Sequence, residues 1–312
     1  MKKTLISMAL TTASILLTPS TFADNALAES TLPESKMTTQ PQCLNAKVTG
    51  KGQAILLLPG FISDESIWQE VSDKLSTNYQ VHQLSIAGFG KNKACHKAQN
   101  IVEAVKSELA NYLANNKLHN PVLIGHSMGG LLAFDASLNP NITLKAAISV
   151  DGLPFIGPIF TRNNQTTVND LMPQAEAMKT MYQQATPAQL VAFTKQGIML
   201  QTNQPSRYND IIDMAKHSDA TTAGSALHSV MTTDLRPKLA KLTNPVLLIG
   251  ASGAFVTDVQ HQAAKAMYQA QIQQAPHVEL AMNSKGHHFL MWDQTDWLIN
   301  TIKTYISRQS DV

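Results

Sequence analysis

A serine occurs in a pattern that can make it a nucleophile. Ser127 lies in Gly125-His126-Ser127-Met128-Gly129, directly after the apolar run at 122–124. Between a strand and a helix this pattern forces a sharp turn, which holds the serine in a strained conformation with its hydroxyl exposed. A helix that begins after Ser127 would aim the Met128 backbone N–H at an oxyanion formed there. The sequence therefore predicts a nucleophilic serine with one oxyanion donor beside it.

A serine hydroxyl is a weak nucleophile until a base removes its proton, so a histidine is needed. Among the 10 histidines, His287 and His288 follow the last strand-like run and precede the terminal helix-like segment. His126 adjoins the serine, but the turn directs its side chain away from Ser127, so we expect it to pack or hydrogen-bond locally.

The elements that must position these residues follow a regular alternation. Apolar runs of strand length occur at 54–58, 81–86, 122–124, 146–150, 246–249 and, more weakly, 278–282. Helical spacing of apolar residues occurs between them, at 67–75, 101–113, 128–137 and 297–306. Strands that alternate with helices indicate a mostly parallel sheet with helices on both faces.

One interval breaks the alternation. Residues 154–236 contain only helix-like stretches, at 168–183, 187–200, 207–216 and 220–231. We therefore predict an α/β fold whose core comprises residues 51–153 and 237–312, with a helical cap at 154–236 inserted between two strands.

From Ala54 to its C-terminus the chain resembles the α/β-hydrolase superfamily. Besides the serine motif, Leu58-Pro59-Gly60-Phe61 resembles the family's His-Gly-x loop, which implies that the Phe61 backbone N–H is the second oxyanion donor. The resemblance also favours His288 as the base, because its spacing to the last helix matches the family. His287 remains the alternative, since it directly follows Gly286.

The acid that should orient the histidine is missing from its usual family position, where the chain reads Gly250-Ala251-Ser252-Gly253. Asp151 follows the strand-like run at 146–150, at the edge of the sheet where such active sites gather. Some family members, including haloalkane dehalogenases and certain lipases, carry their acid there, so Asp151 is preferred. Asp258 is the alternative acid, although an aspartate before a helix is also a typical N-cap.

The N-terminus and the cysteines indicate export. Lys2 and Lys3 precede an apolar stretch with small residues near its end, so residues 1–23 resemble a signal peptide cleaved after Ala23 or Ala28. Residues 24–50 are expected to form a flexible arm. The chain's two cysteines, Cys43 and Cys95, are predicted to form a disulfide in an oxidising compartment. We expect a periplasmic or secreted protein without a stable membrane anchor.

The expected activity is cleavage of a small-molecule carboxylic ester or related acyl compound through an acyl-enzyme. Of the 24 basic residues, Lys2 and Lys3 lie in the expected signal, which leaves 22 against 22 acidic ones and disfavours nucleic acid as a partner. No cofactor motif and no metal-ligand spacing is present. Aminopeptidase, carbon–carbon hydrolase and perhydrolase chemistry remain alternatives, as does a non-catalytic binding protein on the same fold. The oligomeric state is left open.

Overall fold

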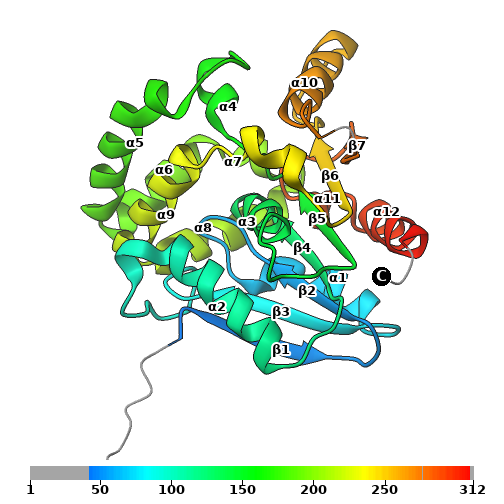
Figure 1. The fold of residues 1–312 in the computed structure, drawn as a ribbon. Helices are drawn as coiled ribbons and strands as arrows, with labels where there is room; N and C mark the ends of the chain where they lie inside the picture. Colours follow the sequence, from blue (N-terminus) through cyan, green and yellow to red (C-terminus); the bar gives the residue numbers. More distant parts are fainter. Residues whose placement is uncertain (1–41, 276, 310–312) are drawn as a thin grey trace, which may run out of the picture. The chain divides into compact units, whose positions relative to one another are not determined.

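The centre of the molecule is a sheet whose strands are mostly parallel (Figure 1). A computed structural model describes residues 42–275 and 277–309. In the described residues the sheet has 7 strands in the order β1-β3-β2-β4-β5-β6-β7, and only β1 runs antiparallel to its neighbour. The strands are β1 Leu44–Thr49, β2 Ala54–Leu58, β3 Gln80–Ile86, β4 Val122–His126, β5 Ala146–Val150, β6 Val246–Ala251 and β7 Glu279–Asn283.

Helices cover both faces of this sheet, as the alternation of apolar runs predicted. The core helices are α1 Gln69–Leu75, α2 Ile101–Asn115, α3 Met128–Ser137, α10 Asp258–Gln271, α11 Leu290–Asp293 and α12 Thr295–Arg308. Successive strand residues point to opposite faces. Leu56 and Leu58 therefore join the apolar cluster that includes α2 and α3, whereas Ile55 and Leu57 join the one that includes α1 and α12. Continuous apolar runs suit strands that are buried on both faces.

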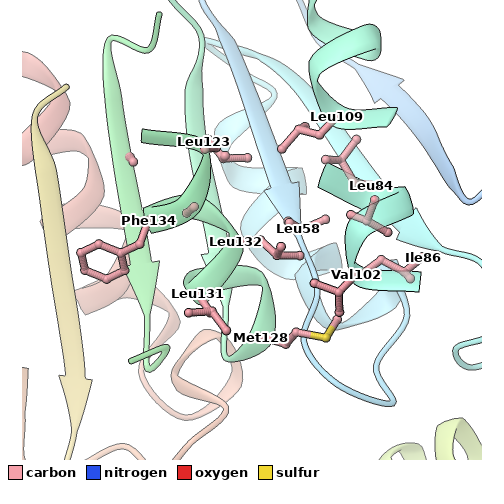
Figure 2. Packing of buried hydrophobic residues seen from close by; sticks show 14 of the residues in the cluster. Leu58, Leu84, Ile86, Val102, Leu109, Leu123, Met128, Leu131, Leu132 and Phe134 are labelled. Carbon is pink, nitrogen blue, oxygen red and sulfur yellow. The ribbon is translucent and has the colours of Figure 1, made fainter. Parts of the chain in front are cut away.

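Figure 2 shows the first of these clusters, with side chains of α2 and α3 packed against the sheet. Leu132 of α3 and Leu109 of α2 lie with strand residues such as Leu58 and Leu123, and all are almost completely buried. Met128, the first residue of α3, belongs to the same cluster. The helix that follows Ser127 is thus anchored in the core, which fixes the position of the turn before it.

The expectation of a flexible arm at 24–50 is wrong for its last residues, because residues 44–49 form the edge strand β1. Its Leu44 pairs with Ile86 of β3, and the Glu108 carboxylate accepts the backbone N–H groups of Cys43 at 2.7 Å and Leu44 at 2.9 Å. This strand was not predicted because only one of its faces contacts the core, so its sequence has no continuous apolar run. The remainder of the arm to residue 41, and the expected signal peptide, lie outside the described residues.

The predicted disulfide between Cys43 and Cys95 is present and ties β1 to the loop after β3. The same loop supports the helices inserted further along the chain. Gly88 accepts the Asp219 backbone N–H at 2.7 Å, and the Gly90 N–H donates to Ser218 Oγ at 3.0 Å. The disulfide therefore stabilises a loop on which part of the cap rests.

The cap lies between β5 and β6, and its interval, residues 154–236, contains helices and no strand, as predicted. Its helices are α4 Gly157–Thr161, α5 Val168–Gln183, α6 Pro187–Gln196, α7 Ile198–Gln201, α8 Tyr208–His217 and α9 Ala220–Thr232. Helices α5 and α9 pack against each other. Thr167 caps α5 and Thr186 caps α6, each in a capping box with the third helical residue. Within the described ranges, no helix has the length and apolar character to cross a membrane.

Candidate active site

Ser127 lies at a tight turn between β4 and α3. Its backbone has φ 55° and ψ −117°, a conformation that residues with a side chain rarely adopt. The turn requires glycine at position 125, because a Cβ there would lie 1.9 Å from the Gly129 carbonyl oxygen. The Ser127 N–H donates to the Val150 carbonyl at 2.9 Å, which fixes the turn beside the end of β5. The strained serine thus lies where β4 and β5 end together.

His288 and Asp151 meet at the same edge of the sheet. Asp151 directly follows β5 and His288 lies between β7 and α11. The His288 ring donates from Nδ1 to Asp151 Oδ2 at 2.6 Å, although 137 residues separate the two in sequence. Their side chains are 27% and 11% exposed, so the pair is partly shielded from water. This bond fixes the ring orientation and leaves Nε2 as the nitrogen that can accept a proton.

The structure records no hydrogen bond between Ser127 Oγ and the His288 ring within residues 42–275 and 277–309. The imidazole nevertheless lies close to the turn, since its ring centroid is 4.5 Å from that of His126, the residue before the serine. In a ligand-free enzyme the bond between nucleophile and base is often long, and it tightens when substrate binds. The arrangement suits proton transfer from the serine once a bound substrate tightens that contact.

The two alternative residues from the sequence have other partners. His287 Nδ1 donates to the Met199 carbonyl of α7 at 3.0 Å, and its backbone N–H donates to Asp293 Oδ2 at 2.8 Å. Its side chain therefore contacts the cap and has no hydrogen bond to Asp151. Asp258 is exposed and is the first residue of α10, whose N-cap is Thr257. The structure brings neither residue into the Asp151–His288 pair.

Two backbone N–H groups near Ser127 are available to an anion. The Phe61 N–H lies in the loop after β2, and the Met128 N–H is the first of α3. Within the described part of the chain, no recorded hydrogen bond has either group as its donor. Met128 is only 2% exposed, and a buried N–H without an acceptor is costly. Both groups are suited to hold an oxyanion.

The cap contributes aromatic side chains that pack near Phe61. The Phe61 ring lies edge-on to Phe89, at 5.9 Å between centroids, and to Tyr182 of α5, at 5.7 Å. Tyr182 in turn contacts Phe193 of α6 at 5.1 Å. Burial raises the pKa of the Tyr182 hydroxyl, which keeps it protonated at neutral pH. A substrate held by the Phe61 N–H would therefore meet an apolar surface built partly by the cap.

Sequence analysis expected His126 to pack or hydrogen-bond locally, whereas in the structure it bonds a segment 162 residues away. It is buried, and its Nε2–H donates to the His288 backbone carbonyl at 3.0 Å, while its Nδ1 has no hydrogen-bond partner among the residues that the structure describes. Burial lowers the pKa of His126 well below its usual value, and the nearby His288 lowers it further. The side chain is therefore neutral, and it links the strand before the serine to the loop that carries His288.

Tyr268 of α10 is a residue that sequence analysis missed. Its hydroxyl donates to Asp151 Oδ1, so it lies directly behind the acid–histidine pair. No local pattern marks it, because it lies in an ordinary amphipathic helix. Within the described residues, no group of three or more histidine, cysteine or acidic side chains is arranged to hold a metal ion.

Comparison with known proteins agrees with the fold. Residues 55–301 match the model of the alpha/beta hydrolase family. The chain is 24% identical over 212 residues to the pimeloyl-[acyl-carrier protein] methyl ester esterase of Vibrio atlanticus, covering 64% of this chain and 76% of that enzyme. The enzyme of the same name from Vibrio cholerae serotype O1 is 27% identical over 108 residues, which span 35% of this chain and only 40% of that enzyme.

Solved structures are similar in fold at low sequence identity. An esterase from Exiguobacterium antarcticum superposes with a TM-score of 0.67 at 18% identity, covering 85% of this chain and 95% of that one. MenH from S. aureus superposes with a TM-score of 0.67 at 17% identity, covering 88% and 100%. At these identities the likeness extends to the fold alone.

Proposed function

Because the chain belongs to the alpha/beta hydrolase family, we propose that it is a serine hydrolase that cleaves carboxylic esters through an acyl-enzyme. The observation that carries this proposal is the 2.6 Å bond between His288 Nδ1 and Asp151 Oδ2 beside the strained Ser127. Nucleophile, acid and base occur along the chain in this order, which is the one that such hydrolases use. The esterase names of the curated relatives support the same reaction.

In the proposed mechanism Ser127 Oγ attacks the ester carbonyl carbon while His288 Nε2 takes its proton. Asp151 holds the imidazole in the required tautomer and stabilises the imidazolium that forms. The carbonyl oxygen becomes an oxyanion, held by the Phe61 and Met128 N–H groups. His288 then protonates the leaving alcohol. In the second step the same nitrogen takes a proton from water, which attacks the acyl carbon; the bond to Ser127 Oγ breaks, and His288 returns the proton to Oγ as the acid leaves. Each oxyanion donor is expected to contribute about 10²- to 10³-fold to turnover.

The surroundings favour an ester with an apolar part. The Phe61 ring, on the residue that supplies one oxyanion donor, contacts Tyr182, and Phe193 extends this aromatic surface within the cap. The names of the curated relatives describe methyl esters, so small alcohol leaving groups are the first substrates to examine.

Two measurements test the proposal together. Wild type should react with a fluorophosphonate probe and hydrolyse members of a panel of methyl, ethyl and p-nitrophenyl esters of increasing acyl length. Ser127→Ala should lose both properties. Replacing Ser107 by alanine serves as the matched control, since Ser107 lies on α2 away from the turn. Ester turnover that survives unchanged in Ser127→Ala would refute the mechanism, and a wild type that neither labels nor turns over would favour a binding protein.

We further propose that the protein acts outside the cytoplasm, in the periplasm or the medium. Lys2, Lys3 and the apolar stretch that follows them support this location, and so does the Cys43–Cys95 disulfide, since disulfides persist in oxidising compartments. N-terminal sequencing of the protein recovered from cell fractions tests it. The expected mature chain begins after Ala23 or Ala28, and an intact Met1 in the cytosolic fraction would contradict export.

A further inference from the structure

The carboxylate of Asp151 is largely shielded from solvent. Its side chain is 11% exposed, and its backbone has φ 52°, which a residue with a side chain seldom adopts. A buried carboxylate is costly unless hydrogen bonds satisfy both of its oxygens. Oδ2 is occupied by His288, so the orientation of the carboxylate depends on what holds Oδ1.

Two donors converge on Oδ1 from different parts of the chain. The backbone N–H of Ala251, the last residue of β6, donates to it at 2.7 Å. The hydroxyl of Tyr268, which lies on α10 and is 117 residues from Asp151 in sequence, donates to the same oxygen. Hydrogen bonds to a charged acceptor are stronger than those between neutral groups.

The position of Tyr268 depends on a glycine in β6. A Cβ at Gly250 would lie 2.8 Å from Tyr268 Cε1 and 2.6 Å from Met282 Sδ, which is closer than real contacts allow. Gly250 therefore leaves the space in which the aromatic ring lies against the strand. The ring itself is 5% exposed and belongs to the larger apolar cluster.

The chemistry of the buried phenol suits a permanent donor. Burial raises the pKa of the Tyr268 hydroxyl well above its usual value, and the neighbouring Asp151 carboxylate raises it further. The phenol therefore stays protonated across the pH range in which a histidine can act as base. His126 is also titratable and faces the pair; its ring lies 4.5 Å from that of His288 and stays neutral.

We propose that Tyr268 is the positioning residue of the acid. Together with the Ala251 N–H it fixes Oδ1, so that Oδ2 alone faces His288 Nδ1. Tyr268 acts through Asp151 and His288 and has no contact with the reacting atoms. The catalytic consequence rests on the proposed function, whereas the orientation of Asp151 can be tested without turnover.

The kinetic test replaces Tyr268 by phenylalanine, which removes only the hydroxyl. We expect kcat to fall about tenfold, which corresponds to about 1.4 kcal/mol of transition-state stabilisation, with KM changed by less than about twofold. Tyr112→Phe is the matched control, because its hydroxyl also hydrogen-bonds a buried group, His82 Nδ1 at 2.7 Å, away from the site. Its kcat should equal that of wild type. An unchanged kcat in Tyr268→Phe would overturn the inference.

A double-mutant cycle separates positioning from general support of the fold. In the Asp151→Ala background the hydroxyl has no carboxylate to hold, so Tyr268→Phe should lower the residual kcat by less than about twofold. A tenfold loss in both backgrounds would mean that Tyr268 supports the fold, and would overturn the proposed role.

The final arm measures the Asp151–His288 bond by proton NMR and needs no turnover. The His288 Nδ1 proton, held in a short bond, should give a resolved low-field resonance that Tyr268→Phe shifts and Tyr112→Phe leaves in place. If Tyr268→Phe fails to fold, fluorotyrosine can be incorporated into the Tyr112→Phe variant instead. Fluorine makes the phenol at position 268 a stronger hydrogen-bond donor, which should shift the same resonance. A resonance unmoved by either change overturns the inference even in an active esterase. A shifted resonance in a chain without ester turnover supports it and refutes only the proposed function.

Discussion

Replacing Asp151 by asparagine should abolish most turnover, because it reverses the tautomer of the His288 ring. The Ala251 N–H at Oδ1 can only donate, and the Tyr268 hydroxyl donates there as well. An asparagine in the same conformation must therefore place its carbonyl oxygen at the Oδ1 position, which turns its NH₂ toward His288 Nδ1. Because an NH₂ only donates, Nδ1 must accept and the ring proton moves to Nε2.

A proton on Nε2 blocks the nitrogen that has to receive the proton of Ser127. The wrong tautomer is expected to lower kcat by about 10⁴-fold, or about 5 kcal/mol, while KM changes little. The assay is steady-state hydrolysis of the best ester from the panel, with melting temperatures measured in parallel to show that the variant is folded.

Asp258→Asn is the matched control, since it makes the same chemical change at the exposed first residue of α10. It should cost at most about 1 kcal/mol of stability through the helix dipole and leave kcat within about twofold of wild type. Retention of more than about a tenth of kcat in Asp151→Asn would refute the tautomer argument. A comparable loss in Asp258→Asn alone would assign the acid to that residue.

Other perturbations follow from the same structure. Replacing Cys43 and Cys95 together by alanine should lower the free energy of unfolding by about 4 kcal/mol for a cross-link that spans 52 residues, and a difference below about 1 kcal/mol in urea titrations would contradict the loop-closure reasoning. His126→Leu should lower kcat about tenfold, because the His288 carbonyl loses its donor and the loop that carries the base is less constrained; equal kcat would show that the bond has no positioning role. Burial lowers the pKa of His82, so below about pH 6.5 the unfolded chain binds a proton that the folded chain does not, and stability falls as pH drops. His82 contributes at most about 1.4 kcal/mol per pH unit to the slope of unfolding free energy against pH. Denaturation at pH 7, 6 and 5 should give a smaller slope for His82→Gln than for wild type, and identical slopes for the two proteins would exclude His82 as the source.

Local sequence patterns were sufficient for much of the fold. The continuous apolar runs of β2, β4 and β5 were recognised because a strand buried on both faces is apolar at most of its positions. The glycines around Ser127 marked the turn, since the steric requirement acts between residues only a few positions apart. The edge strand β1 was missed for the opposite reason, because most of its residues are exposed or half-buried and its position depends on pairing with β3.

Contacts between distant residues were beyond the reach of such patterns. From sequence, Asp151 and Asp258 were both open as the acid and His287 and His288 as the base, since each candidate follows a strand or precedes a helix. The parallel sheet brings the ends of β5 and β7 to one edge, where His288 meets Asp151 across 137 residues of sequence.

The sequence by itself determined the strand–turn–helix around Ser127 and the alternation of strands and helices, because both arise from interactions between residues near one another in the chain. Only the tertiary structure decided that Tyr268 holds one oxygen of Asp151 while His288 takes the other. A hydrogen bond of this kind depends on positions set by the packing of α10 and β6, and no spacing of residue types along the chain encodes it.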